Sequence, residues 1–301
     1  MTKLVDGKKI AREILDDLKS KIIESGIKPR LAVFMVGDDA ASLSYTRVKQ
    51  KRGGEIGINV EIKNFPETIA QEQLLAEIKK ANSAADVSGI LIQLPLPQHL
   101  DRDEALDTID PKLDVDCLTA ENRKLLIEGR PRFVPPAAAA VMKILEYHHV
   151  PLAPSFTKEG DGGSSASRNI LIVGSGDLIG KPLSAILLNQ KVPFQLANRH
   201  TENLNKLTRE ADIILTGAGA RGLITGDMIK QGAIIIDAGT SESDYSGFVG
   251  DVDTDSVMGK ASLLSPVPGG VGPVTVAMLL QNVVESALQK KKRNHKHLKI
   301  A

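Results

Sequence analysis

The sequence predicts an α/β protein built on parallel sheets. Short apolar runs alternate with amphipathic helical stretches through the first half of the chain, and the same rhythm returns in the second half. Because parallel strands need a crossover connection, this alternation favours parallel sheets that are covered on both faces. The length of 301 residues suits two domains or one large α/β unit. Hydrophobic residues at 42% and charged residues at 25% exclude a disordered chain.

The first half opens with a helix and then alternates strands and helices. Apolar residues at helical spacing predict an amphipathic helix over residues 7–25. The run at residues 31–37 is almost entirely apolar and ends in glycine, which is typical of a buried parallel strand. The later elements are a helix at 42–57, a strand at 59–65, a helix at 69–85 and a strand in VSGILIQLPLP.

The second half repeats this pattern after a polar interruption. Residues 156–168 form a Gly/Ser cluster without apolar period, which predicts a surface loop. A long, mostly apolar helix is expected from Pro273, and the tail KKKRNHKHLK predicts a solvated helix end, with RNA or membrane binding as the alternative. The predicted strands are 169–174, 192–198, 211–217, 232–239 and SLLSPVP.

Composition argues against several classes of partner. Lys and Arg number 38 against 37 Asp and Glu, so no overall field attracts nucleic acid or an anionic membrane. The single cysteine, Cys117, allows neither an internal disulfide nor a thiolate metal cluster, and we expect no metal site. The start resembles no signal peptide, and no stretch approaches the uninterrupted apolar length of a membrane span. We therefore expect a cytoplasmic protein with a small-molecule partner.

A glycine-rich turn follows the first strand of the second half. Gly174, Gly176 and Gly180 lie between that strand and a helix, where glycines and free N–H groups suit a dinucleotide pyrophosphate. The third glycine comes one residue later than in the usual fingerprint, and an ordinary strand-to-helix turn is the alternative. After the next strand stand Arg199 and His200, where an NAD enzyme carries an acidic residue. These cations favour NADP over NAD.

Polar residues in the first half suggest a second site. Tyr45 and Lys49 lie four residues apart on a predicted helix and share one face, although a solvated charged face is the alternative. Gln93 follows a strand, and Asp114 and Asp116 stand in LDVDCL. Because the carboxyl ends of strands line the ligand crevice of open α/β sheets, these side chains are candidates for one site, with a turn or cap as the alternative for Asp116.

Taken in order, these segments resemble the methylenetetrahydrofolate dehydrogenase/methenyltetrahydrofolate cyclohydrolase family. The matching motifs are VGDDAASLSYTRVKQK, GILIQLPLP, DVD and PVPGGVGPVT, and the resemblance runs nearly from end to end. It implies a parallel-sheet substrate domain, a Rossmann-like NAD(P)-binding domain and a cleft between them. It further implies a folate-binding catalytic domain at 1–135 and 274–301 and a dinucleotide-binding domain at 136–273, in an enzyme that forms homodimers.

The resemblance implies two reactions on a folate substrate. Hydride passes from 5,10-methylenetetrahydrofolate to NADP, and water then converts the methenyl product to 10-formyltetrahydrofolate. Lys49 is the implied catalytic lysine, Tyr45 orients it or stacks on the folate, Gln93 hydrogen-bonds it, and Asp116 holds the pterin. The implied contacts of the cofactor are Gly174, Ser175, Gly176, Gly180, Arg199 and Thr240, and further folate contacts are Pro268, Gly269 and Gly270.

The sequence departs from the family pattern mainly in the half that would bind the cofactor. Ser175 stands where the family carries an arginine, and Asn198 and Arg199 replace a His-Ser pair. Residues 135–138 read Pro-Pro-Ala-Ala instead of Pro-Cys-Thr-Pro, and Cys117 replaces a glycine. We expect Arg199 to compensate for the missing arginine. A cyclohydrolase with impaired dinucleotide use and a non-catalytic folate- or nucleotide-binding module are the alternatives.

Overall fold

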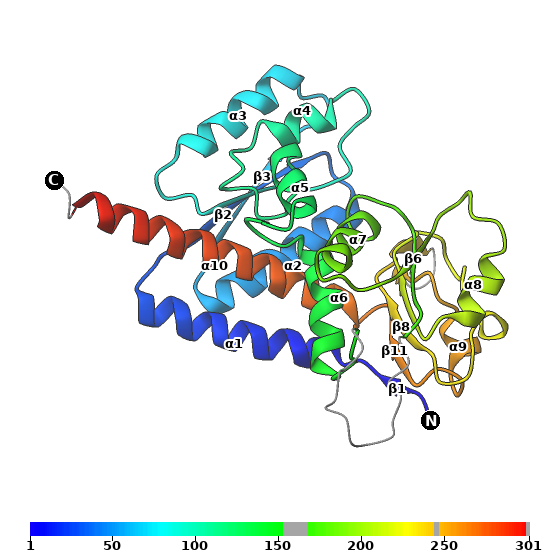
Figure 1. Ribbon diagram of the computed structural model, residues 1–301. Helices are drawn as coiled ribbons and strands as arrows, with labels where there is room; N and C mark the ends of the chain where they lie inside the picture. The colour runs from blue at the N-terminus through cyan, green and yellow to red at the C-terminus, as the bar shows by residue number, and fades with distance from the viewer. Residues whose placement is uncertain (153–167, 244–246, 299–301) are drawn as a thin grey trace. The chain divides into compact units, whose positions relative to one another are not determined.

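The computed structural model describes residues 1–152, 168–243 and 247–298 (Figure 1). The chain forms two compact units, each with its own parallel sheet. The six-stranded unit comprises Met1–Ile10 and Ala137–Thr275. The three-stranded unit comprises Ala11–Pro136 and Val276–Ala301. This arrangement agrees with the expected α/β class.

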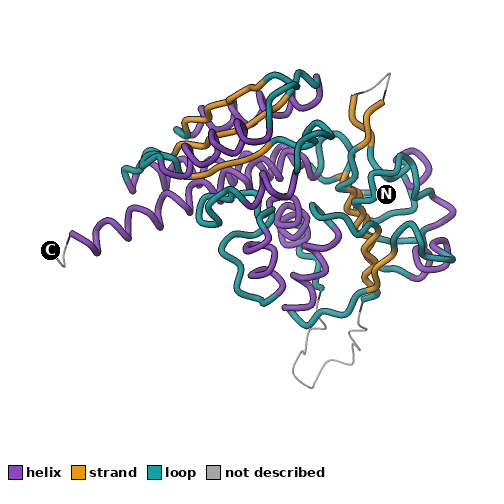
Figure 2. The backbone as a smooth tube through the Cα atoms, turned by 90° about the horizontal axis from the view of Figure 1, so that it is seen from above, coloured by secondary structure: helices purple, strands orange, loops and turns teal. Residues whose placement is uncertain are grey.

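The sheet of the six-stranded unit is entirely parallel and has the order β1-β11-β8-β7-β5-β6. Strand β5 is followed in the chain by β6 on one side of it and by β7 on the other, so the topological switch point lies at its carboxyl end. Figure 2 shows this sheet along its edge, with helices on either side. In sheet order the strands are Lys3–Leu4, Leu263–Ser265, Ile234–Asp237, Ile213–Thr216, Ile170–Val173 and Gln195–Ala197.

Short helices and one hairpin complete this unit. Its interior includes Leu171, Ile214, Ile235 and Leu264 from four neighbouring strands, each at most 1% exposed. Because these strands are buried on both faces, they read as continuous apolar runs rather than alternating ones. The other elements are α6 (Pro136–Tyr147), α7 (Gly180–Asn189), α8 (Leu204–Glu210), η1 (Gly226–Met228), α9 (Thr254–Val257), and an antiparallel pair, β9 (Ser241–Ser243) and β10 (Gly247–Val249).

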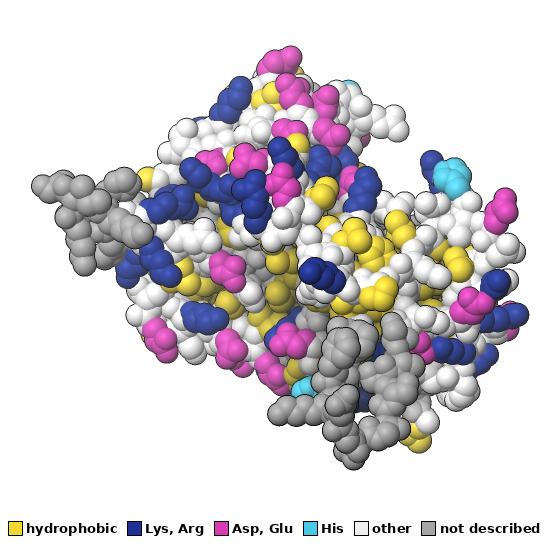
Figure 3. Space-filling view, in the orientation of Figure 1, with side chains coloured by type: hydrophobic (Ala, Val, Ile, Leu, Met, Phe, Trp, Pro, Cys, Tyr) yellow, Lys and Arg dark blue, Asp and Glu magenta, His cyan; other side chains and the backbone are white. Residues whose placement is uncertain are grey.

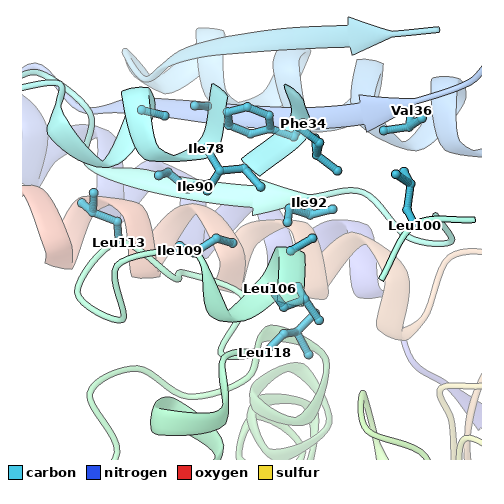
Figure 4. Close-up of a cluster of buried hydrophobic side chains, with 14 of the residues drawn as sticks. Phe34, Val36, Ile78, Ile90, Ile92, Leu100, Leu106, Ile109, Leu113 and Leu118 are labelled. Atoms are coloured by element: carbon cyan, nitrogen blue, oxygen red, sulfur yellow. The ribbon is translucent and has the colours of Figure 1, made fainter. Parts of the chain in front are cut away.

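The three-stranded unit has the strand order β3-β2-β4, again all parallel. Phe34 of β2 and Ile90 of β4 are fully buried against Ile78 of α3 and Leu106 of α4, in the hydrophobic cluster of Figure 4. The elements, of which α1 and α10 begin in the six-stranded unit, are α1 (Gly7–Ser25), β2 (Arg30–Val36), α2 (Ala40–Ile56), β3 (Asn59–Phe65), α3 (Gln71–Ser83), β4 (Gly89–Ile92), α4 (Arg102–Asp107), α5 (Ala120–Ile127) and α10 (Val271–Leu298).

The structure differs from the sequence expectations at several boundaries. The predicted strand at 192–198 shrinks to Gln195–Ala197, whereas the helix at 7–25 and the strand at 59–65 have the predicted bounds. Residues 1–10, which the expected division assigns to the folate-binding domain, pack with the six-stranded unit, because β1 pairs with β11. The loop expected at residues 156–168 lies outside the described residues, apart from Arg168.

Helix α10 is the longest helix of the described chain. Over Val271–Arg293 it is long and apolar enough, by length and composition, to cross a membrane. This differs from the expectation that no stretch approaches such a length. However, 61% of the window is buried inside the structure, which is the behaviour of a core helix. Its apolar length therefore reflects packing within the protein.

Candidate functional site

Helix α2 presents the predicted lysine on its buried face. Asp39 caps the helix by accepting a hydrogen bond from the backbone N–H of Ser42 at 2.7 Å, so α2 starts two residues earlier than expected. Thr46 and Lys49 follow on the same face, and Lys49 is only 8% exposed. A Cβ on Gly53 would lie 2.5 Å from the Val60 side chain, so this glycine lets α2 approach β3 closely. Lys49 is therefore not part of a solvated charged face.

The four catalytic candidates of the first half converge around the Lys49 amine. The Lys49 Nζ donates a hydrogen bond to Oε1 of Gln93 at 2.9 Å and lies 5.6 Å from the centroid of the Tyr45 ring. Gln93 directly follows β4, and its Nε2 donates to the carbonyl of Leu94 at 2.9 Å, which orients the amide. The charge of Asp116 acts on the same amine. The predicted hydrogen bond between Gln93 and Lys49 is thus present.

Burial changes the protonation equilibria of this cluster. Desolvation lowers the pKa of Lys49, and the nearby Asp116 carboxylate opposes part of that shift. The pKa of Asp116 is raised to about 6, mainly by desolvation and in part by the Asp114 charge, against the lowering effect of Lys49. Burial likewise raises the pKa of Tyr45. The result is an amine that gives up a proton more readily than an exposed lysine, which suits a proton-transfer role.

Asp114 has a structural task rather than a place in the ligand crevice. Its buried carboxylate accepts hydrogen bonds from the backbone N–H groups of Leu118 and Thr119 at 3.2 and 2.9 Å, and from Nδ2 of Asn122 at 2.9 Å. These bonds close the turn that carries Asp116, whose side chain is half-buried. Asp114 therefore has the turn role that was the alternative for Asp116, whereas Asp116 joins the Lys49 cluster.

Cys117 occupies a backbone conformation that favours glycine. Its φ is +62°, in the left-handed region, and its side chain is 2% exposed. The backbone therefore accounts for the glycine that the resemblance led us to expect here. Burial, with Asp114 and Asp116 nearby, raises the pKa of the thiol well above its usual value, so Cys117 is a protonated, inert group.

In the glycine turn of the six-stranded unit, steric crowding explains why two of the three positions are glycine. Gly174 has φ +105°, and a Cβ there would lie 2.5 Å from the carbonyl oxygen of Gly217. A Cβ on Gly180 would lie 1.9 Å from the carbonyl oxygen of Gly174. A Cβ on Gly176 would meet nothing within 4 Å. The turn is thus tightly packed on the protein side and open at Gly176, beside the half-buried Ser175.

The predicted cationic residues directly follow β6, the strand beside β5 and its glycine turn. Strands β5 and β6 are parallel neighbours with Val173 opposite Ala197, so their carboxyl ends lie at one edge of the sheet. Asn198 organises the β6 turn by accepting a hydrogen bond from the backbone N–H of His200 at 2.9 Å. Nε of the exposed Arg199 donates to Nε2 of His200 at 3.1 Å. Two groups able to bind an anion therefore stand beside the glycine turn.

The remaining predicted contacts also lie at the carboxyl edge of the six-stranded sheet. Thr240 is exposed, three residues after the end of β8. Pro268, Gly269 and Gly270 follow β11, and Gly269 has φ +107°. The carbonyl of Gly269 accepts a hydrogen bond from the N–H of Gly7 at 3.0 Å, which ties this loop to the start of α1. The predicted folate contacts are therefore divided between the two units, with Tyr45 and Asp116 in the other one.

Sequence reasoning missed several residues that support these sites. Asn282 of α10 donates from Nδ2 to the carbonyls of Val115 and Val134, each at 2.9 Å, and so anchors the segment that carries Asp116. In the six-stranded unit, Asp237 and Asp251 are buried carboxylates beneath the sheet edge. Polar residues that end or interrupt apolar runs, as in GAIIIDAG, were the available signal. No group of metal ligands occurs among the residues that the structure describes.

Comparison with known proteins matches each part of the chain to a domain of one enzyme family. The profile described as the catalytic domain of tetrahydrofolate dehydrogenase/cyclohydrolase matches residues 5–116, and that of the NAD(P)-binding domain matches residues 135–291. A Bifunctional protein FolD from Nautilia profundicola is 39% identical over 287 residues, which cover 94% of this chain and 96% of that protein.

Two solved structures extend the likeness to three dimensions. The bifunctional dehydrogenase/cyclohydrolase from Campylobacter jejuni has a TM-score of 0.88 and 36% identity over 96% of this chain and 99% of its own. The enzyme from Trypanosoma brucei, complexed with NADP and an inhibitor, has a TM-score of 0.87 and 32% identity over 96% and 98% of the two chains.

Proposed function

The chain belongs to the tetrahydrofolate dehydrogenase/cyclohydrolase family, and we propose that it catalyses both reactions of such enzymes. In the first, 5,10-methylenetetrahydrofolate loses a hydride to NADP and becomes the methenyl cation. In the second, water adds to the methenyl carbon, a proton leaves, and the ring opens to 10-formyltetrahydrofolate. The single observation that carries the proposal is the buried Lys49 amine with Gln93, Tyr45 and Asp116 around it.

Lys49 is the proposed proton-transfer group of the second reaction. Desolvation lowers its pKa, and a cationic substrate would lower it further, so the amine can accept a proton from the attacking water. Gln93 holds the amine in place through the 2.9 Å hydrogen bond. Asp116 is proposed to bind the amino-pyrimidine edge of the pterin, and Tyr45 to stack on the folate. Pro268, Gly269 and Gly270 are further proposed folate contacts.

The residues of the six-stranded unit fit a dinucleotide. Gly176 leaves open space at the switch point of the sheet, and α7 starts directly behind the turn without a side-chain cap. Gly174, Ser175 and Gly180 would hold the pyrophosphate, and Arg199 would bind the 2′-phosphate. Thr240, in the loop after β8, is a further proposed contact. When bound, NADP supplies a nicotinamide ring that accepts the hydride, and the protein contributes its position relative to the folate carbon.

A single set of assays tests the proposal. Purified protein is mixed with 5,10-methylenetetrahydrofolate and NADP, with NAD, or with neither, and the formation of NADPH or NADH and the consumption of added methenyltetrahydrofolate are followed by absorbance. We expect reduction with NADP and accelerated hydrolysis. Hydrolysis without reduction would identify a cyclohydrolase that has lost dinucleotide use. The absence of both activities would identify a binding module.

Removing the Arg199 side chain should weaken binding of NADP specifically. We expect Arg199→Ala to raise the dissociation constant for NADP by about tenfold, because a charge-assisted contact with the 2′-phosphate is lost. Binding of NAD, which has no such phosphate, should be unchanged. Calorimetric titration with both dinucleotides measures this, with Arg209→Ala, another exposed arginine of the same unit, as the matched control. Equal NADP affinity in Arg199→Ala and wild type would remove Arg199 from the site.

We also propose that the protein forms a homodimer through the β6 edge. Within the described residues, β6 pairs only with β5, which leaves its other edge without a strand partner. Leu196 of β6 is 41% exposed, and Leu188 of α7 and Leu178 just before α7, in the connection between β5 and β6, are 66% and 48% exposed. An exposed strand edge is a template for pairing with another chain, and exposed apolar side chains favour such a contact. On the face shown in Figure 3, acidic and basic side chains are interspersed.

Charges introduced at this edge should separate the subunits. We expect the variant Leu188→Glu with Leu196→Glu to have the mass of one 32.2 kDa chain by light scattering, whereas wild type has twice that mass. The control is Ile127→Glu, at a 70% exposed position of the other unit. A wild-type protein that elutes as a single chain would contradict the proposal.

The inert, buried thiol of Cys117 is compatible with a cytoplasmic location, which we propose as well.

A further inference from the structure

Two buried carboxylates of the six-stranded unit are not used by the reactions above. Asp237 is the last residue of β8 and is 2% exposed, and Asp251 follows β10 and is 0% exposed. A glycine makes room for each one. A Cβ on Gly239 would lie 2.2 Å from Cγ of Asp251, and a Cβ on Gly250 would lie 2.0 Å from Oδ2 of Asp237. The two carboxylates, together called the Asp pair, are therefore enclosed by backbone.

Asp251 binds the end of β7 and the loop that follows it. Its Oδ2 accepts hydrogen bonds from Oγ1 of Thr216 at 2.7 Å and from the N–H of Ala218 at 2.6 Å. Its Oδ1 accepts a hydrogen bond from the N–H of Ala220 at 2.8 Å. One side chain thus satisfies two backbone donors in the loop 217–220, which contains no helix or strand. Without it, these donors would lose their protein partner.

Asp237 connects that loop to the next one along the sheet edge. Its carboxylate accepts hydrogen bonds from the N–H groups of Gly239 at 2.9 Å, Asp251 at 3.2 Å and Val252 at 3.0 Å. The bond to Gly239 holds the loop that contains Thr240. The bonds to Asp251 and Val252 hold the backbone that carries the first carboxylate. The Asp pair therefore links the loops after β7 and β8 through six hydrogen bonds in all.

This arrangement is expensive for the folded state. The pKa of Asp237 is raised to about 7, first by desolvation and then by the like charge of Asp251, although the three backbone donors lower it. Well-packed apolar residues often replace buried charges without loss of stability. The hydrogen bonds of the Asp pair go to loop backbone at the ligand-facing edge of the sheet, which indicates that the pair holds the shape of these loops.

The loop held by Asp251 forms one wall of the glycine turn. Gly174 packs so closely on this loop that its Cβ would lie 2.5 Å from the carbonyl oxygen of Gly217 and 2.9 Å from the N of Ala218. The N–H of Ala218 is one of the groups bound by Asp251. A shift of the loop therefore moves the surface on which the glycine turn rests. In open α/β sheets, dinucleotides bind at the carboxyl edge, at the switch point.

We propose that Asp251, supported by Asp237, is a positioning residue for the dinucleotide: it holds loop 217–220 against the glycine turn and ties it to the loop that contains Thr240. This inference rests on the proposed function, because it assumes that NADP binds at this edge. Asp251 is buried and has its oxygens occupied by protein donors, so it acts through the loops and not by contact with the cofactor.

The test uses binding of NADPH to the full-length protein, measured by its fluorescence. Asp251→Asn keeps the shape of the side chain but turns one acceptor into a donor that faces an N–H group. We expect its dissociation constant for NADPH to rise by about tenfold or more. Hydrolysis of added methenyltetrahydrofolate, which needs no dinucleotide, should stay within about twofold of wild type. The matched control is Asp253→Asn, whose exposed side chain caps α9 two residues further along.

A second variant keeps the test decisive if Asp251→Asn does not fold. Thr216→Val removes one hydrogen bond to Asp251 and keeps the shape of the side chain, so we expect a rise of about threefold in the dissociation constant for NADPH. If wild type binds NADPH and both folded variants bind it equally well, the inference is overturned. A parallel loss of methenyl hydrolysis would also overturn it, since the effect would then be general unfolding. If wild type itself fails to bind NADPH, the proposed function fails instead.

Discussion

Lys49→Met should abolish hydrolysis of methenyltetrahydrofolate, with a fall in the rate of about a thousandfold or more. Methionine fills a similar volume but has no amine to move a proton, and it removes the partner of the Gln93 side chain. Hydride transfer depends mainly on the positions of the two reactants, so reduction of NADP should fall much less. Stopped-flow absorbance of methenyltetrahydrofolate, together with the rate of NADPH formation, measures both effects on one sample.

The neighbouring lysine provides the matched control for this experiment. Lys51 lies two residues further along α2 and is exposed, so Lys51→Met should hydrolyse the methenyl compound at the wild-type rate. The thermal midpoints of both variants should show that α2 still folds. Formation of 10-formyltetrahydrofolate at the wild-type rate by Lys49→Met would refute the proton-transfer assignment. An equal loss in Lys51→Met would show that general disturbance of α2 is responsible.

Two positions of the glycine turn, Gly176 and Gly180, should respond differently to an added methyl group. In Gly180→Ala the new Cβ would lie 1.9 Å from a backbone oxygen, so the chain must shift, at a cost of about 3 kcal/mol in the free energy of unfolding. In Gly176→Ala the Cβ meets no protein atom within 4 Å, and we expect a change of less than about 0.5 kcal/mol. The methyl group of Gly176→Ala would instead occupy the space through which the pyrophosphate approaches the backbone, and the dissociation constant for NADPH should rise by about tenfold.

Denaturant unfolding and NADPH titration of both variants separate these effects. Gly180→Ala is expected to lose stability, and Gly176→Ala is expected to lose affinity alone. Wild-type affinity in Gly176→Ala would place the dinucleotide elsewhere. Wild-type stability in Gly180→Ala would mean that the contact with the Gly174 carbonyl relaxes without cost, and the tight packing of the turn would then have no steric consequence.

The predicted elements agree with the structure most closely where one periodic signal covers the whole element. The helix at residues 7–25 has apolar side chains at helical spacing along its length, and its bounds agree with those of α1. The strand at 192–198 was overextended because Val192 is buried in the turn after α7, not in the sheet. Strand β1 was missed because two residues carry no period, and only pairing with β11 makes them a strand.

The same limit applies to the candidate sites. Spacing along one helix placed Tyr45 and Lys49 on a common face, and the structure brings them together. Spacing gave no means to separate Asp114 from Asp116, because their difference depends on which carboxylate meets the backbone donors of Leu118 and Thr119. Asn282 was out of reach, since it lies 167 residues from the carbonyl of Val115 that it binds.

The sequence by itself determined the α/β class and the family, and it supplied two sets of candidate site residues, because strand and helix periods and the glycine turn are local patterns. Only the tertiary structure decided that Lys49 is buried against Gln93, that residues 1–10 join the six-stranded unit, and that Asp237 and Asp251 bind the loops at the sheet edge. Burial and hydrogen bonding between distant segments set these properties, including the pKa of each buried group. No local pattern of residues contains that information.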